Sequence, residues 1–201
     1  MTTPLPADAE TLFARLRDSL KDALGVSCNG LVQGGADAPK GEGAAGACSG
    51  AAPSGGEDAP AFIGIHTGGA WLAARLHAEL GLSSPLGFLS SAFYRDDVQA
   101  RGLSMRMQPT RIDFDVNGRD IVLVDDILHT GRTIRAALNE IFDYGRPARV
   151  RLAVLIDRGE RELPVQPDHV GTRLVLQPGE KLALSQRTNG MFELRVETVQ
   201  A

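Results

Sequence analysis

The segment IVLVDDILHTGRT, residues 121–133, carries the residue types most able to do chemistry. Its four leading apolar residues predict a buried strand, with Asp125 and Asp126 at the carboxyl end. Gly131, in the turn that follows, lets the backbone approach a ligand or adopt positive φ. Such a turn offers backbone N–H groups, the N-terminus of a helix and two threonine hydroxyls to a phosphate. Two carboxylates that accept hydrogen bonds from a diol, beside a phosphate cradle, indicate a ribose 5-phosphate site.

The alternative interpretation of this segment is structural: a strand with an acidic end, followed by a helix capped by Thr133. Each part of the pattern is common, but the combination in this order favours the binding site. The segment is not a P-loop, because no Gly-Lys-Ser/Thr follows it.

The elements that must position this segment predict an α/β fold. An amphipathic helix is expected at residues 8–24, where leucine recurs every fourth residue. Beyond it, the predicted strands are 62–66, 88–94, 120–126 and 149–159, and the predicted helices are 70–80 and 133–145. Apolar strands that alternate with helices imply a parallel sheet covered on both faces. Ligands of such sheets bind at the carboxyl ends of strands, where the turns 67–69, 125–133 and 157–159 would all lie.

Composition sets the outer limits of function. Residues 28–60 are rich in Gly and Ala, which predicts a flexible insertion within a single domain spanning 1–201. The formal net charge of −4 does not indicate a nucleic-acid binder. No apolar run could span a membrane, and no signal peptide is evident, so a cytoplasmic location is expected. Cys28 and Cys48 have no metal-ligand spacing and are interpreted as incidental thiols.

On these motifs the chain resembles a known family. Residues 121–133 are similar to the phosphoribosyl pyrophosphate (PRPP) motif of type I phosphoribosyltransferases. The segments IGIHTGGAWLAARL, FYRDDV and YGRPARVRLAVLIDRGERELPVQPDHVG extend the resemblance to the PyrR family, pyrimidine operon attenuators that are also uracil phosphoribosyltransferases. The resemblance covers most of residues 61–176. It implies the type I phosphoribosyltransferase fold, a mostly parallel twisted sheet with helices on both faces.

The resemblance also implies roles for the motif. Asp125 and Asp126 would hold the ribose hydroxyls, and the 5-phosphate would be held by His129, Thr130, Gly131, Arg132 and Thr133. Uracil would displace pyrophosphate from PRPP to give UMP. Mg²⁺ would arrive on PRPP oxygens, with no direct protein ligand expected.

The TGG turn takes the position of the family's pyrophosphate loop, with Thr67 and Gly68 as ligand contacts. The family pattern leads us to expect basic residues where Gly68 and His66 stand. Loss of a charge-assisted contact to pyrophosphate would reduce activity, and His66 could replace it only when protonated.

Three further residues are candidates by similarity. Arg95, in FYRDDV, is expected near the mouth of the site as a catalytic residue, the alternative being a solvated charge cluster. Arg158 is expected to face the base, the alternative being an ion pair with Asp157 or Glu162. Leu174 is expected to lie over the base.

Three functions stay open on the sequence alone: an active uracil phosphoribosyltransferase, a nucleotide-sensing RNA-binding regulator with little catalysis, and a transferase for another base. RNA binding rests on the resemblance only, because the basic residues of the first helix are balanced by acids. The resemblance also implies a homo-oligomer.

Overall fold

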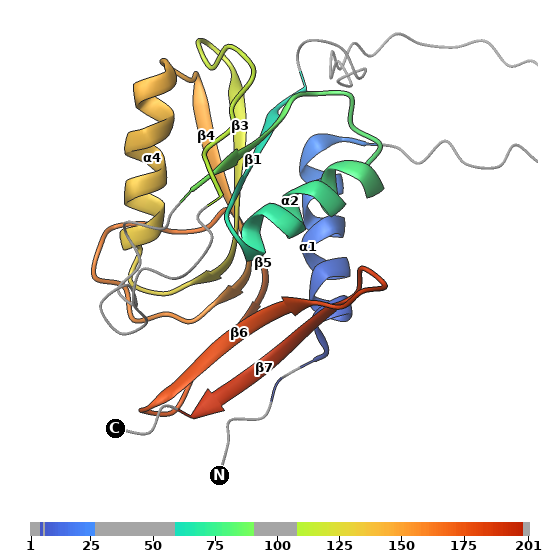
Figure 1. The fold of residues 1–201 in the computed structure, drawn as a ribbon, viewed down its shortest axis with the longest axis vertical. Helices are drawn as coiled ribbons and strands as arrows, with labels where there is room; N and C mark the ends of the chain where they lie inside the picture. The colour runs from blue at the N-terminus through green and yellow to red at the C-terminus, as the bar shows by residue number, and fades with distance from the viewer. Residues whose placement is uncertain (1–4, 6, 27–58, 91–107, 199–201) are drawn as a thin grey trace, which may run out of the picture.

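The structure is a computed structural model that describes residue 5 and residues 7–26, 59–90 and 108–198 (Figure 1). Five strands form one parallel sheet in the order β2-β1-β3-β4-β5. Their bounds are Ala61–Ile65 (β1), Leu86–Leu89 (β2), Asp120–Leu128 (β3), Arg149–Asp157 (β4) and His169–Arg173 (β5). The α/β class and the parallel sheet are confirmed. Of the predicted insertion at 28–60, residues 28–58 lie outside the described residues, whereas Ala59 is already buried.

Helices cover both faces of the sheet, which is why its central strands are continuous apolar runs. Helices α1 (Ala9–Leu24) and α2 (Gly68–Glu79) lie on one face, and α4 (Arg132–Tyr144) lies on the other (Figure 1). Phe13, Leu16 and Leu72 belong to the core under α1 and α2. Ile134 and Ile141 belong to the core under α4. The sheet is therefore a rigid platform for whatever its strand ends carry.

Helix α1 has the bounds that the leucine periodicity predicts, within one residue. The Asp8 carboxylate caps it by accepting a hydrogen bond from the Thr11 backbone N–H at 2.8 Å. The helix ends at Gly25, whose φ of 63° closes it in the left-handed conformation.

Two elements were not predicted from the sequence. Strand β5 extends the sheet beyond β4, so the interpretation of β4 as the last core strand is wrong. Strands β6 (Glu180–Gln186) and β7 (Phe192–Thr198) form a separate antiparallel hairpin. The hairpin packs on α1, with the rings of Phe13 and Phe192 5.4 Å apart. Both elements are short or half-polar, so neither gives a long apolar run to detect.

The strand predicted at 88–94 begins earlier than expected, at Leu86, and residues 91–107 lie outside the described residues. Within the described part of the chain, no helix is both long and apolar enough to cross a bilayer.

Candidate active site

The sheet order places a topological switch point between β1 and β3. From β1 the chain passes outward to β2, and from β3 it passes the other way to β4. The loops after the two central strands therefore diverge and leave a crevice at their carboxyl ends. Residues 66–69 follow β1 and residues 125–133 close β3, so the fold brings together the two segments that the sequence singled out.

The paired aspartates differ in environment. Asp125 is 2% exposed, and its Oδ1 accepts the backbone N–H of Asp126 at 3.0 Å. Asp126 is half-buried beyond it. Strand β3 continues past both residues to Leu128, which pairs with Asp157 on β4. Asp125 and Asp126 thus lie near the carboxyl end of β3, beside the crevice.

The predicted phosphate turn leads directly into α4. Gly131 has φ of 90° and precedes the first helical residue, Arg132, so the helix cap is Gly131 and not Thr133. The hydroxyl of Thr130 accepts the Arg132 backbone N–H at 3.3 Å. No acidic side chain occupies the first turn of α4. The positive end of this helix is therefore open to an anion.

The TGG segment is the start of a helix, not the free turn that was predicted. Helix α2 begins at Gly68, with Thr67 as its N-cap, and both glycines are buried. The peptide bond between His66 and Thr67 is cis. A Cβ on Gly68 would overlap the Asp126 carboxylate, and one on Gly69 would overlap the Val124 carbonyl. Gly68 therefore allows the start of α2 to lie against Asp126, and the described structure offers no support for the reduced activity expected from Gly68.

His66 does not offer a cation in place of the missing basic residue. Burial lowers the pKa of its imidazole, which favours the neutral ring at pH 7. The ring lies 5.6 Å from that of Phe88, at the end of the neighbouring strand β2.

The segment after β4 closes against the phosphate turn. The Arg158 backbone N–H donates to the Leu128 carbonyl at 2.9 Å, so Arg158 lies beside the end of β3. Its guanidinium is 14% exposed and lies 3.7 Å from Glu160. Its Nε is buried with no hydrogen-bond partner among the described residues. Among the described ion pairs, Arg158 thus pairs with Glu160, whereas Asp157 pairs with Arg161 and Glu162 pairs with Arg132.

Arg161 was not singled out from the sequence. Its guanidinium contacts Asp157 at 2.5 Å and the His129 carbonyl at 2.7 Å, bridging the base-side segment and the phosphate turn. Two exposed pairs join the same segments: His129 with Glu160 at 3.0 Å, and Arg132 with Glu162 at 2.5 Å. The side chains of His129 and Arg132 are thus engaged across the loop interface.

Leu174 is half-buried, and its backbone N–H donates to the Asp157 carbonyl at 2.9 Å. It therefore lies next to the predicted base side of the crevice. Arg95, the remaining catalytic candidate, lies outside the described residues.

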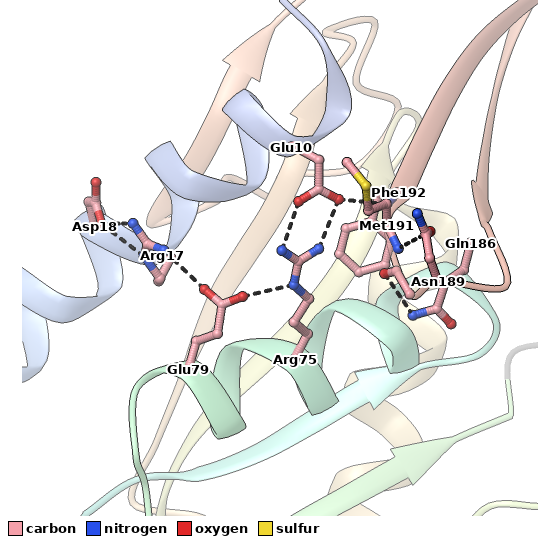
Figure 2. Close-up of polar contacts among 10 residues, drawn as sticks. Glu10, Arg17, Asp18, Arg75, Glu79, Gln186, Asn189, Met191 and Phe192 are labelled. Carbon is pink, nitrogen blue, oxygen red and sulfur yellow. Dashed lines mark hydrogen bonds and ion pairs between the residues drawn. The ribbon is translucent and has the colours of Figure 1, made fainter.

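A cavity of about 890 Å³ adjoins the crevice but does not include residues 125–133. It is lined by His66 and Phe88, by the exposed side of α2, by residues around Pro109 and by the tip of the hairpin. Figure 2 shows its polar edge, where Arg75 of α2 lies between α1 and the hairpin. No group of three or more potential metal ligands occurs in the described ranges.

Comparison with known proteins agrees with this geometry. A model of the phosphoribosyl transferase domain matches residues 42–176. The protein called Bifunctional protein PyrR from Nitrosococcus oceani is 56% identical over 128 residues, which are 63% of this chain and 72% of that protein. The protein of the same name from Pseudomonas aeruginosa is 53% identical over 129 residues, 64% of this chain and 76% of that protein.

Solved structures support the fold at lower identity. A hypoxanthine-guanine phosphoribosyltransferase from Bacillus anthracis aligns with a TM-score of 0.56 at 15% identity, covering 87% of this chain and 85% of that one. The hypoxanthine phosphoribosyltransferase of Trypanosoma cruzi aligns with a TM-score of 0.53 at 16% identity, covering 85% and 81%. From the family model and these relatives, the chain is a phosphoribosyltransferase that belongs to the PyrR family.

Proposed function

We propose that this protein transfers the ribose 5-phosphate of PRPP to uracil, giving UMP and pyrophosphate, and that it also regulates pyr gene expression in response to pyrimidine nucleotides. One observation carries the proposal: Asp125 and Asp126 adjoin both the open N-terminus of α4 and the start of α2 at the switch point. The relatives named Bifunctional protein PyrR support the choice of uracil and the regulatory role.

In this reaction the base nitrogen forms a bond to the anomeric carbon while the bond to the pyrophosphate oxygen breaks. Residues 129–133 would hold the 5-phosphate, and Asp125 and Asp126 would hold the ribose hydroxyls and stabilise positive charge on the sugar. Thr67 and Gly68 would bind pyrophosphate through the start of α2. Arg158 and Leu174 would contact the base side, and Arg95 would act from the segment that follows β2.

This donor set is compatible with Mg²⁺ that enters the site bound to PRPP. The carboxylates of Asp125 and Asp126 are hard oxygen donors suited to Mg²⁺, but the described residues hold no three-ligand cluster. The ion would therefore be held mainly by PRPP oxygens and water. When bound, it would neutralise charge on the departing pyrophosphate.

The test is steady-state formation of UMP from uracil and PRPP with Mg²⁺, run beside hypoxanthine and guanine as alternative bases. The proposal expects turnover with uracil and little with either purine. Comparable turnover with a purine would contradict the choice of base, and no turnover with any base would favour a sensor without catalysis.

RNA is proposed as a partner from the PyrR relatives and not from the charge of the described helices. On α1, Arg17 is neutralised by Asp18 at 2.8 Å and by Glu79 at 3.0 Å, so this helix offers little free positive charge. Filter binding of pyr leader RNA with and without UMP would test the regulatory role, which requires affinity that changes with the nucleotide. The homo-oligomer and the cytoplasmic location stay predictions, the first testable by light scattering during size-exclusion chromatography.

A further inference from the structure

Arg161 is a side chain whose donors reach two loops. Its Nη2 donates to Asp157 at 2.5 Å, and its Nε donates to the Val165 carbonyl at 3.1 Å. Its Nη1 lies within reach of three more carbonyls, His129 at 2.7 Å, Gly159 at 2.9 Å and Leu128 at 3.4 Å. Two of these acceptors, Leu128 and His129, belong to the phosphate turn, and the other three groups belong to the segment 157–165.

Backbone hydrogen bonds also join the phosphate turn to the segment 157–165. The N–H groups of Glu162 and Leu163 both donate to the Thr130 carbonyl, at 3.1 and 3.2 Å. A Cβ on Gly131 would contact Val165 and Leu163 at 3.4 and 3.5 Å, so the segment covers the turn at its glycine. The phosphate turn is thus supported from outside by residues that follow β4.

Only a guanidinium can serve so many acceptors at once. Arginine presents five N–H donors in a fixed plane, whereas lysine presents a single point charge. The Arg161 and Asp157 side chains are only 20% and 10% exposed, so their charge-assisted hydrogen bonds are shielded from water. Removal of Arg161 would leave the Asp157 carboxylate and several carbonyls without this donor.

We propose that Arg161 is a positioning residue that holds the segment 157–165 against residues 128–133 and so keeps the nucleotide 5′-phosphate site in its binding shape. The inference rests on the proposed function, because it takes residues 129–133 as the 5′-phosphate site. Arg161 itself touches the turn from behind through carbonyl oxygens, which an anion does not use. Its effect on ligands is therefore indirect.

The experiment compares Arg161→Ala and Arg161→Lys with the wild type by calorimetry, using UMP and uridine as ligands. Arg161→Ala should weaken UMP binding about tenfold, which corresponds to 1.4 kcal/mol, and should leave uridine binding nearly unchanged. Arg161→Lys should restore only part of the loss. Equal weakening of UMP and uridine would show general damage to the site and would overturn the positioning role.

Arg173→Ala is the matched control. Arg173 also faces Asp157, at 3.7 Å, but its side chain is 80% exposed, and its only ion pair among the described residues is this one. It should bind UMP like the wild type. If Arg173→Ala weakens UMP binding as much as Arg161→Ala does, the affinity depends on neutralising the charge of Asp157 and not on the contact between Arg161 and the phosphate turn, which would overturn the proposal.

Hydrogen exchange separates this inference from the proposed function. Without ligand, Arg161→Ala should speed exchange at the amides of Glu162 and Leu163, and UMP should slow it there in the wild type. If the wild type binds no UMP, the proposed function fails while the ligand-free comparison still tests the bridge. Unchanged exchange at these two amides in Arg161→Ala would overturn the bridge itself.

Discussion

At the scale of single residues, the site depends on a close approach between Gly68 and Asp126. The family pattern led us to expect a basic residue where Gly68 stands. Such a pattern records residue types and does not record the space that a glycine leaves for its neighbours. The structure shows that a side chain at this position would have to share its place with the Asp126 carboxylate. The consequence of the glycine is a close approach between the start of α2 and Asp126, the residues proposed to hold pyrophosphate and the ribose hydroxyls.

Replacing both aspartates tests the clamp. Asp125→Asn with Asp126→Asn should weaken UMP binding by more than tenfold, because each lost charged acceptor costs about 1.5–3 kcal/mol at a ribose hydroxyl. Calorimetry with UMP measures the effect. Asp143→Asn, on the exposed side of α4, is the control and should bind UMP normally. Unchanged affinity in the double variant would contradict the assignment.

Gly68→Ala tests the close approach. The added methyl group overlaps the Asp126 carboxylate, so that side chain must rotate away from its place at the clamp. We expect a several-fold rise in KM for PRPP and a melting temperature near that of the wild type, since Asp126 is only half-buried. Kinetics and thermal unfolding measured together decide the point. A KM equal to that of the wild type would show that Asp126 does not need this space.

At the scale of elements, α1, α2 and the hairpin meet at Arg75 (Figure 2). Its guanidinium pairs with Glu10 of α1 at 2.7 Å and with Glu79 at 2.8 Å. It also lies 4.4 Å from the ring centre of Phe13 and 5.1 Å from that of Phe192. Since Glu10 accepts the Phe192 backbone N–H at 2.6 Å, one arginine of α2 organises both terminal elements.

Arg75→Ala should lower the free energy of unfolding by about 1–3 kcal/mol, because it removes partly buried ion pairs and a cation–π contact. Glu10→Gln and the double variant complete a double-mutant cycle measured by urea unfolding. The matched control is Arg195→Ala, which removes an exposed partner of Glu193. A loss in Arg75→Ala no greater than that in the control would show that Arg75 does not hold these elements together.

The elements that could be predicted from the sequence are those whose sequence patterns depend on neighbouring residues. The bounds of α1, the strand β3 and the helix α4 follow from apolar periodicity and glycine stops, which neighbouring residues determine. The hairpin carried only a weak signal: Leu182 and Leu184 lie two positions apart between Lys181 and Ser185, but the residue between them is Ala183. Arg161 gave no signal at all. Four of its contacts are to backbone carbonyls, which every residue type possesses.

At the scale of the whole molecule, buried His169 and half-buried His66 link stability to pH. Burial lowers the pKa of His66. The pKa of His169 is lowered mainly by burial and also by the positive charge of nearby Arg151, and the negative charge of Asp168 opposes this with a smaller effect. His169 also contacts Ser19 of α1 through its Nδ1 at 3.0 Å. Both rings are therefore neutral in the folded protein over a pH range in which the unfolded chain binds protons.

We therefore expect the free energy of unfolding to rise with pH up to about 6.5, the ordinary histidine pKa. Above that pH these two histidines should no longer change the free energy of unfolding. The sign follows because the unfolded state holds more protons than the folded state in that window. Urea unfolding at pH 5.5 and 7.5 measures the difference, and His169→Gln should reduce it. An equal difference in the variant would rule out a contribution from His169.

The hydrogen bond from Phe192 to Glu10 joins residues 182 positions apart. During synthesis, α1 leaves the ribosome before the sheet strands, yet the aromatic partner of Phe13 arrives only when the hairpin has been made. The apolar surface beneath the hairpin therefore stays exposed until the hairpin has been synthesised. A chain truncated before residue 192 would therefore contain every residue of the phosphate turn but would expose the apolar residues that the hairpin covers. Such a chain would be a target for cellular protein quality control.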